Sequence, residues 1–329
     1  MKALLCPGEG VQLVDRPEPR AGAGEVVLAV RSAGICNTDL EIARGYMGFR
    51  GVLGHEFVGE VVEGPLGSPP PAEWDGRRVA AEINCACRSC PVCRQGDGYH
   101  CPTRTVLGIL GRDGALAERV AVPESTLHAL PDALEDERAV FIEPLAAALH
   151  AFDEVELTPK DRVLLLGDGK LGLLIGLALA DRRDQVARAL AVGRHHEKLA
   201  ILAARGLEVA LEQEFDEPAG FDLVIEATGS PHGLTRALEA VRPLGTLVLK
   251  STYAGDANVD LAPIVINELR VVGSRCGDFP RAIAALARGQ VDPRPLISER
   301  FALEDAERAF ARASEPGVIK VLVDPLRAG

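Results

Sequence analysis

The sequence lacks a surplus of positive charge, since 36 Lys and Arg residues face 48 Asp and Glu residues, which gives a net charge of -12. Nucleic acids bind basic surfaces, so this balance argues against DNA or RNA as a partner. The sequence also lacks an apolar run of the roughly 18 residues that a membrane helix needs, because Gly172, Gly176 and Asp181 interrupt the longest candidate. No signal-peptide core is present near the start, where Pro7 and Gly8 follow only four apolar residues. We therefore expect a cytoplasmic protein that binds neither nucleic acid nor membrane.

The chain is long enough for two domains, since its 329 residues are about twice the roughly 150 residues of an average domain. Up to Glu143 it is rich in Gly, Pro and short Val-rich runs, which are typical of strands joined by tight turns. From Arg162 onward, apolar runs alternate with helical segments, as in a parallel sheet covered by helices on both faces. We predict an α/β protein with a β-rich domain over residues 1–150, a doubly wound parallel-sheet domain over 151–274, and a segment over 275–329 that returns to the first domain.

Three glycines, Gly167, Gly169 and Gly172, form a GxGxxG motif between the apolar run RVLLL and an apolar helical segment. The first Gly permits a tight turn, the second lets a pyrophosphate approach the backbone, and the third lets the helix pack on the strand. Lys170 and Leu171 lie inside the motif, where the helix begins and its N-terminus faces the phosphates. In this context the motif predicts a dinucleotide-binding site.

The end of the next predicted strand bears on the choice between NAD and NADP. The run ARALAV is followed by Gly193 and Arg194, where an NAD-binding domain carries an acidic residue that binds the ribose. Gly makes room for a 2′-phosphate and Arg supplies charge to bind it, so we expect NADP, with NAD as the alternative. The opposing interpretation is that Arg194 is only a solvated residue at a strand end.

Five of the eight cysteines lie close together between residues 85 and 101 of a long chain without a secretion signal, which favours metal binding over disulfides. Four thiolates fill a tetrahedral zinc shell and leave no open position, so such a site stabilises structure and does not catalyse. The alternatives are an iron–sulfur cluster or free buried thiols. Cys85 stands outside the spacing and is expected to be a spectator. The predicted structural-zinc ligands are Cys87, Cys90, Cys93 and Cys101.

A second set of residues has the ligand types of an open zinc site. Cys36 is followed by Thr38 and Asp39, and His55 stands beside Glu56. A thiolate, an imidazole and a carboxylate leave a fourth zinc position for water or substrate. Taken singly, each residue has an ordinary explanation as a core thiol, a turn histidine or a solvated carboxylate.

Six motifs follow one another along nearly the whole chain. They are CNTD from Cys36, GHEFVGEVVEG from Gly54, the four-cysteine segment, EPLA from Glu143, GDGKLG from Gly167 and VIEATG from Val224. In this order they resemble the motifs of the zinc-containing medium-chain dehydrogenase/reductase superfamily, the alcohol dehydrogenase superfamily. Glu143 stands where the classical alcohol dehydrogenases carry a Cys ligand, so the sequence is most similar to the polyol, sugar and threonine dehydrogenase branch.

The resemblance implies a role for each residue of the predicted open zinc site. Residues matching Cys36, His55 and Glu56 bind the catalytic zinc, and the residue matching Glu143 binds zinc or its water. Asp39 matches a carboxylate that holds the zinc-bound imidazole and fixes its tautomer. Thr38 matches a hydroxyl that passes the substrate proton towards solvent. The resemblance thus implies catalytic roles for Thr38, Asp39 and Glu56.

The same resemblance implies a GroES-like catalytic domain, a Rossmann domain with the active site in the cleft between them, and two zinc ions per chain. Its activity would be hydride transfer between NAD(P)(H) and an alcohol, polyol or sugar, or the corresponding carbonyl compound. The partners expected are a small-molecule substrate and further copies of the chain, as a homodimer or homotetramer. The residues expected to bind the cofactor are Gly167, Gly169, Lys170, Leu171, Gly172, Gly193, Arg194, Thr228, Gly229, Lys250, Gly273 and Ser274.

Two other functions compete with this interpretation. The chain could bind zinc and cofactor without turnover, as a sensor or structural protein, but Thr38 argues against this because a binding protein needs no proton relay. It could also be a zinc-free quinone or enoyl reductase of the same fold. Such reductases typically lack both the four-cysteine segment and the Cys, His and Glu set, so we do not expect one here.

The sequence departs from the family pattern in three ways. The interval from Cys36 to His55 is shorter than in sugar and polyol dehydrogenases, which removes part of a loop that shapes the substrate pocket. Gly193 and Arg194 replace the acidic NAD-binding residue, and Cys85 has no counterpart. The cluster of Tyr46, Met47 and Phe49 is a candidate for an apolar pocket wall, with ordinary core packing as the alternative.

Overall fold

The computed structural model describes residues 1–153, 155–217, 219–252 and 258–325. The chain forms two compact units, which we describe separately. The first unit comprises Met1–Glu143, Phe279–Ala287 and Leu296–Gly329, and the second comprises Pro144–Asp278 and Arg288–Pro295. The boundary between the units falls within helix α4 (Ile142–His150).

The first unit is built on a seven-stranded sheet. Six of its strands lie side by side in the order β11, β6, β5, β3, β19, β18. The seventh, β10, pairs with the long central strand β3. The apolar residues Val26, Leu28 and Val30 of β3 are fully buried, because alternate side chains of a strand face the core. The strands are β3 (Glu25–Gly34), β5 (Glu56–Glu63), β6 (Arg78–Ala81), β10 (Arg119–Pro123), β11 (Leu127–Ala129), β18 (Ile297–Ala302) and β19 (Lys320–Asp324).

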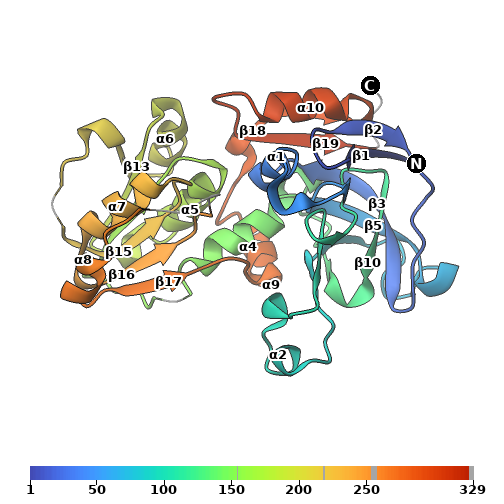
Figure 1. Ribbon diagram of the computed structural model, residues 1–329, viewed down its shortest axis with the longest axis horizontal. Helices are drawn as coiled ribbons and strands as arrows, with labels where there is room; N and C mark the ends of the chain where they lie inside the picture. Colours follow the sequence, from blue (N-terminus) through green and yellow to red (C-terminus); the bar gives the residue numbers. More distant parts are fainter. Residues whose placement is uncertain (154, 218, 253–257, 326–329) are drawn as a thin grey trace. The chain divides into compact units, whose positions relative to one another are not determined.

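The C-terminal strand β19 completes the sheet of the N-terminal part of the chain. It pairs antiparallel with β3, with Leu322 opposite Gly34 and Val323 opposite Ala33. Helix α10 (Ala306–Ala313) packs on β19 and buries Phe310 with its alanines (Figure 1). The remaining helices of this unit are α1 (Asn37–Ile42), α2 (Pro91–Arg94), α3 (Asp136–Ala139) and α9 (Phe279–Ala287).

Two small sheets complete the first unit. One has the order β2 (Gln12–Asp15), β1 (Lys2–Cys6) and β4 (Gly51–Val52). The other, β7 (Asn84–Cys85), β8 (Thr105–Leu107) and β9 (Gly111–Arg112), lies at the base of the segment that carries α2. That segment extends away from the main sheet of its unit in Figure 1.

The second unit is a six-stranded parallel sheet with the order β14, β13, β12, β15, β16, β17. The strands are β12 (Arg162–Leu166), β13 (Arg188–Gly193), β14 (Glu208–Leu211), β15 (Phe221–Glu226), β16 (Val241–Leu249) and β17 (Arg270–Gly273). The covering helices are α5 (Lys170–Ala180), α6 (His196–Ala203), α7 (Pro231–Ala240) and α8 (Ala262–Ile266). From β12 the chain adds β13 and β14 on one side of the sheet, and then β15, β16 and β17 on the other side. The strand order therefore reverses between β12 and β15, as in a doubly wound sheet. The predicted α/β fold class is confirmed.

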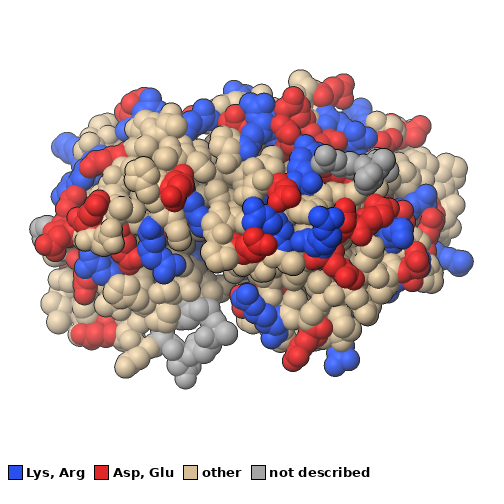
Figure 2. Space-filling model, turned by 90° about the horizontal axis from the view of Figure 1, so that it is seen from above, with Lys and Arg blue, Asp and Glu red and all other residues tan. Residues whose placement is uncertain are grey.

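Helix α5 is apolar on all sides, and its residues from Gly172 to Ala180 are buried. Such a helix is stable only inside a protein core. A Cβ atom on Gly176 would lie 2.5 Å from Leu202 of α6, so glycine allows the close approach of these two helices. Within the part of the chain that the structure describes, no helix has the length and apolar composition to cross a membrane. On the face shown in Figure 2, Lys and Arg side chains are interspersed with Asp and Glu side chains.

Candidate active site and metal centres

The pairing of two strands brings three potential zinc ligands together. Gly34 at the end of β3 lies opposite Glu56 at the start of β5, so Cys36 after β3 lies beside His55 before β5. One ligand atom from each of Cys36, His55 and Glu56 lies within 4.8 Å of the others. A Cβ atom on Gly34 would lie 2.7 Å from Glu56 Oε2, so glycine at this position makes room for the carboxylate.

Asp39 holds the two halves of this group in place. Its Oδ2 accepts a hydrogen bond from Cys36 N at 2.8 Å, and its Oδ1 accepts one from Gly54 N at 3.1 Å. His55 Nδ1 lies 3.3 Å from Asp39 Oδ1, an ion-pair distance without a well-formed hydrogen bond. The fully buried Asp39 carboxylate therefore orients His55 and leaves Nε2 as the nitrogen available to a metal.

Burial and neighbouring charges shift the pKa values of His55 and Asp39 in opposite directions. Burial alone would lower the pKa of His55, but the Asp39 carboxylate and Cys36 outweigh it, and the pKa is raised well above its usual value. Burial alone would raise the pKa of Asp39, but His55 and two backbone N–H groups lower it. A metal ion binds only a neutral imidazole, so zinc and a proton compete for His55.

Glu56 also contacts a buried cation, Lys320, that was not among the site residues predicted from the sequence. Lys320 Nζ, from the first residue of β19, donates hydrogen bonds to Glu56 Oε2 and, at 3.5 Å, to the carbonyl oxygen of Ile35. The two side chains are 3% and 2% exposed. Burial alone would lower the pKa of Lys320, but the Glu56 carboxylate raises it overall. A single Lys in the apolar run VIKVLV was the available sequence signal.

Thr38 and Glu143 have different relations to the ligand group. Thr38 lies in the first turn of α1, and its Oγ1 is 3.7 Å from Cys36 Sγ. Glu143 is the second residue of α4 and is half-buried. Within the described residues, the clustered ligand atoms come from Cys36, His55 and Glu56, and the Glu143 carboxylate is outside this cluster.

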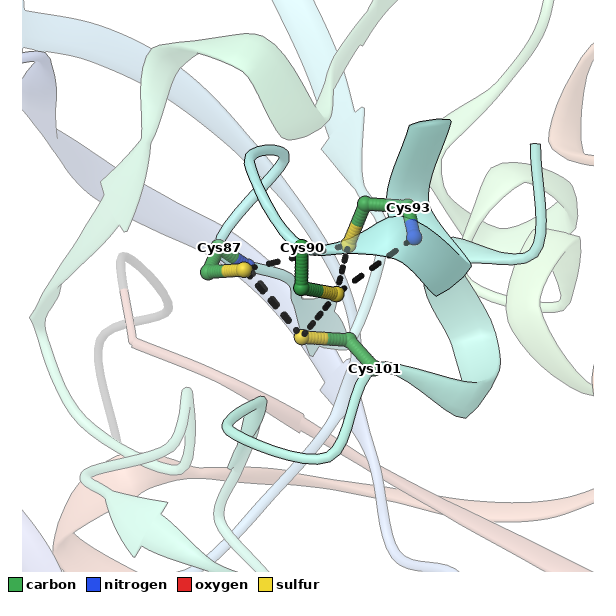
Figure 3. Close-up of side chains that lie close together, drawn as sticks. All are labelled: Cys87, Cys90, Cys93 and Cys101. Carbon is green, nitrogen blue, oxygen red and sulfur yellow. Dashed lines mark hydrogen bonds between the residues drawn. The ribbon is translucent and has the colours of Figure 1, made fainter. Parts of the chain in front are cut away.

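The cysteine segment brings four sulfur atoms into a compact group (Figure 3). The Sγ atoms of Cys90 and Cys93 are 3.4 Å apart, those of Cys87 and Cys101 are 3.6 Å apart, and the pairs Cys90–Cys101 and Cys87–Cys93 are separated by 3.9 and 4.0 Å. Zn–S bonds of about 2.3 Å in a tetrahedron separate the sulfurs by about 3.8 Å. The group therefore fits one tetrahedral ion, and it is too compact for a cluster in which each thiolate binds a different iron.

Local structure supports this arrangement. Cys90 caps helix α2 by accepting a hydrogen bond from Cys93 N at 3.4 Å, and Pro91 occupies the first helical position. Hydrogen bonds from Ser89 lower the pKa of the Cys87 thiol to about 5, which favours the thiolate that zinc binds. Cys85 is different: it is buried in β7 outside the group, and burial raises the pKa of its thiol.

The GxGxxG motif connects β12 to α5, and its glycines meet different surroundings. Gly167 has φ +116°, and a Cβ atom there would lie 2.5 Å from the carbonyl oxygen of Ala227. A Cβ atom on Gly172 would collide with the carbonyl oxygen of Gly167, whereas one on Gly169 would meet no atom within 4 Å. Gly169 is also the N-cap of α5. The open space above this helix N-terminus fits an approaching pyrophosphate, with Lys170 and Leu171 in the first turn.

The other expected cofactor residues lie at the carboxyl ends of neighbouring strands. After β15, Thr228 donates to Glu226 Oε1 through its N and Oγ1 atoms, at 2.7 and 2.6 Å, and Gly229 N donates to Ser251 Oγ at 2.8 Å. After β16, Lys250 Nζ donates to Ala147 O, Ser274 Oγ and Arg275 O at 2.8, 3.0 and 3.1 Å.

Lys250 therefore ties α4 to the end of β17. Gly273, the last residue of β17, has open space at its Cβ position.

Beyond β13, the expected pair Gly193 and Arg194 has an unexpected neighbour. Asp168, between the first two glycines of the motif, accepts a hydrogen bond from Arg194 N at 2.9 Å. Asp168 is 5% exposed, whereas Arg194 is exposed. Asp168 was not among the site residues predicted from the sequence, although its place in GDGKLG was a signal.

The aromatic cluster after α1 divides between surface and core. Tyr46 and Met47 are 41% and 55% exposed, and Phe49 is 7% exposed within the core of the first unit. Phe49 thus follows the core-packing interpretation, and Tyr46 and Met47 remain candidates for a pocket wall.

Two family models match consecutive parts of the chain. Residues 22–132 match the Alcohol dehydrogenase GroES-like domain, and residues 136–324, more than half of the chain, match the Glucose dehydrogenase C-terminus. The chain belongs to the zinc-containing medium-chain dehydrogenase/reductase superfamily. Its resemblance to that superfamily and its GroES-like and Rossmann fold are confirmed.

Relatives within the superfamily match over nearly their whole length. The chain is 33% identical to an L-threonine 3-dehydrogenase of Streptomyces coelicolor, over 98% of this chain and 99% of the relative. It is 29% identical to a D-arabitol-phosphate dehydrogenase of Enterococcus avium, over 97% and 95% of the two chains. A structure described as a short chain alcohol dehydrogenase from E. coli CFT073 complexed with NADH has a TM-score of 0.89 at 28% identity, with 98% and 99% coverage.

These matches establish the class of reaction. This member of the superfamily is a zinc-dependent oxidoreductase that transfers a hydride between NAD(P)(H) and a CH–OH donor or its carbonyl counterpart. The enzyme interpretation is favoured over a zinc- and cofactor-binding protein without turnover, because the matched relatives are dehydrogenases.

Proposed function

We propose that Cys36, His55 and Glu56 hold a catalytic zinc ion at which a secondary alcohol of a small polar substrate is oxidised. The observation that carries this proposal is the three-ligand group within 4.8 Å, since three protein ligands leave a zinc position for substrate. A bound zinc ion supplies a Lewis acid that lowers the pKa of an alcohol, and a bound dinucleotide accepts its hydride.

The protein residues around the group have distinct tasks in this proposal. Asp39 keeps His55 in the orientation that exposes Nε2. The Asp39 carboxylate is itself fixed by the backbone N–H groups of Cys36, after β3, and Gly54, before β5. Thr38, 3.7 Å from the Cys36 sulfur, accepts the substrate's hydroxyl proton and passes it towards solvent. Lys320 balances the Glu56 charge. Glu143, from α4, is the remaining carboxylate that binds zinc or its water.

The names of the relatives support a polar substrate class. D-arabitol phosphate, sorbitol and L-threonine each carry a secondary alcohol beside other polar groups, and dehydrogenases named for them match this chain over at least 97% of its length. We infer that the substrate is a polyol, sugar or hydroxy amino acid of this kind.

We also propose that Cys87, Cys90, Cys93 and Cys101 hold a second, structural zinc, so that each chain binds two. Sulfur separations of 3.4 to 4.0 Å support this second site. Thiol groups that bind metal instead of forming disulfides fit a reducing compartment, so we place the protein in the cytoplasm.

A homodimer is the oligomeric state that the second unit favours. Strand β17 is at the edge of its sheet, and Val271 on it is 37% exposed. Helix α8 beside it exposes Val265 and Ile266 at 78% and 75%. An apolar surface next to a strand that ends the sheet, among the residues that the structure describes, favours association with a second copy. Light scattering on the variant Val265→Asp tests this, with a shift from dimer to monomer as the expected result and an unchanged mass as the contradicting one.

The catalytic proposal is tested by following dinucleotide reduction with D-arabitol, sorbitol and L-threonine, and with 1-propanol as a primary alcohol control. We expect reduction with at least one secondary alcohol, its loss after chelation, and its recovery with added zinc. A zinc-loaded protein that binds dinucleotide and oxidises none of these secondary alcohols would contradict the proposed substrate class.

A further inference from the structure

Asp168 occupies the space beside Gly193 that was expected to be open for a 2′-phosphate. Asp168 lies between the first two glycines of the motif and is 5% exposed. Oδ2 accepts hydrogen bonds from Arg194 N at 2.9 Å and His195 N at 2.7 Å, and lies 2.9 Å from His195 Nδ1. These contacts hold the carboxylate rigidly against the end of β13.

The Asp168 side chain fills the space that a side chain at position 193 would occupy. A Cβ atom on Gly193 would lie 2.6 Å from Asp168 Cβ, 2.7 Å from Cγ and 2.8 Å from Oδ2. Glycine at position 193 therefore accommodates Asp168, and its lack of a side chain is no sign of room for a 2′-phosphate. The glycine-rich loop thus places a carboxylate at the end of β13, where position 193 itself has none.

We propose that Asp168 replaces the acidic residue at the end of the second strand and makes the protein prefer NAD(H) to NADP(H). This inference rests on the proposed use of the loop for a dinucleotide. An acidic group at this corner accepts a ribose hydroxyl and repels a 2′-phosphate. This preference is the reverse of the one inferred from Gly193 and Arg194 alone.

Arg194 is the main opposing feature, because its charge would attract a 2′-phosphate. Its side chain is exposed, so solvent and salt screen its charge. Asp168 is buried and fixed, and screening there is weaker. The His195 side chain is 43% exposed, and its Nδ1 lies near the same Asp168 oxygen that accepts the backbone N–H groups of Arg194 and His195. The fixed carboxylate should therefore decide the preference over the solvated guanidinium.

The first test is a fluorescence titration of NADH and NADPH against the zinc-loaded wild-type protein. We expect NADH to bind at least about tenfold more tightly, which corresponds to 1.4 kcal/mol. Tighter binding of NADPH would overturn this inference and leave the proposed function intact. Binding of neither dinucleotide would overturn the proposed function itself, so the two failures are distinguishable.

Asp168→Asn removes the charge and keeps the size of the side chain. We expect the ratio of NADPH to NADH dissociation constants to fall by about tenfold. The matched control is Asp184→Asn, which makes the same charge change at a side chain that is 87% exposed. An unchanged ratio in a folded Asp168→Asn variant would overturn the inference, and so would an equal change in the control.

A relocated carboxylate provides a second test that does not depend on Asp168→Asn folding. The double variant Asp168→Gly/Gly193→Asp moves the acid from the loop to the strand end and removes the Asp168 Cβ that would lie 2.6 Å from a Cβ at position 193. We expect it to retain the NADH preference, whereas Asp168→Gly alone loses it. Loss of the preference in a double variant that still binds both dinucleotides would contradict the role assigned to the carboxylate.

Discussion

Lys320 and Glu56 form an ion pair in which neither side chain is more than 3% exposed. The pair links the last strand of the chain, β19, to a predicted zinc ligand at the start of β5. Lys320 also donates to the carbonyl of Ile35, one residue before Cys36. The C-terminal strand thus contributes to both sides of the candidate zinc site.

Removing the Lys320 charge should destabilise the protein strongly. Lys320→Met leaves the Glu56 carboxylate buried without its cation, and breaking a buried ion pair costs about 3–5 kcal/mol. Urea denaturation of the zinc-free protein measures this loss, with Lys160→Met, at an exposed position, as the control. The double variant Lys320→Met/Glu56→Gln should recover much of it. A loss below about 1 kcal/mol would show that the pair is not a significant support of the fold.

Asp39 should control zinc affinity without being a ligand. Asp39→Asn removes the charge beside His55 and keeps one of the two oxygens that accept backbone N–H groups. Loss of such a carboxylate typically weakens metal binding by about 10–100-fold. We expect a loss of zinc affinity in this range, measured by competition titration with a chelator. Unchanged zinc affinity would show that His55 is oriented by its own backbone alone.

The four-cysteine segment should support the stability of the fold and contribute nothing directly to turnover. Cys90→Ser should release one zinc and lower the melting temperature, because metal binding contributes to folding free energy. Cys85→Ser is the matched control, since Cys85 lies outside the four-sulfur group and should retain both zincs. Equal zinc loss in the two variants would refute the assignment of the four ligands.

The stability of the protein should depend on pH through Asp222, a residue outside both candidate zinc sites. Its carboxylate accepts hydrogen bonds from Arg162 N at 2.7 Å and Arg242 Nε at 2.6 Å. Burial alone would raise its pKa, but these two contacts lower it below the usual 3.8. A lowered folded-state pKa gives stability that is complete above the unfolded-state pKa and is lost as the pH falls through the folded-state value.

Thermal denaturation of wild type and Asp222→Asn between pH 3 and 7 tests this dependence. The difference in melting temperature should be constant near neutral pH and shrink below about pH 4. A difference that stays constant down to pH 3 would contradict the shift.

Sequence patterns predicted the fold class well because apolar periodicity and turn residues are local signals. RVLLL followed by GxGxxG is an example, since both the strand and the helix start are encoded within eleven residues. The candidate ligands could also be found, because Cys36, His55 and Glu56 lie in short motifs. Lys320 could not be connected to Glu56, since their contact depends on β19 pairing with β3.

Asp168 shows a second limit of sequence reasoning. The absence of a side chain at Gly193 predicted open space, but the space depends on a residue 25 positions earlier that folds back onto the strand end. The identity of residue 193 alone does not reveal that the Asp168 side chain fills the space beside it. Conversely, the cysteine spacing was informative because all four sulfurs belong to one short segment.

The most direct test of the central claim is zinc per chain, measured by elemental analysis together with alcohol-dependent dinucleotide reduction, in wild type and Cys36→Ser. We predict two zincs and turnover in wild type, and one zinc, no turnover and a smaller loss of melting temperature than in Cys90→Ser in the variant. A Cys36→Ser protein that keeps both zincs and full turnover would contradict the assignment of Cys36, His55 and Glu56 as the catalytic metal site.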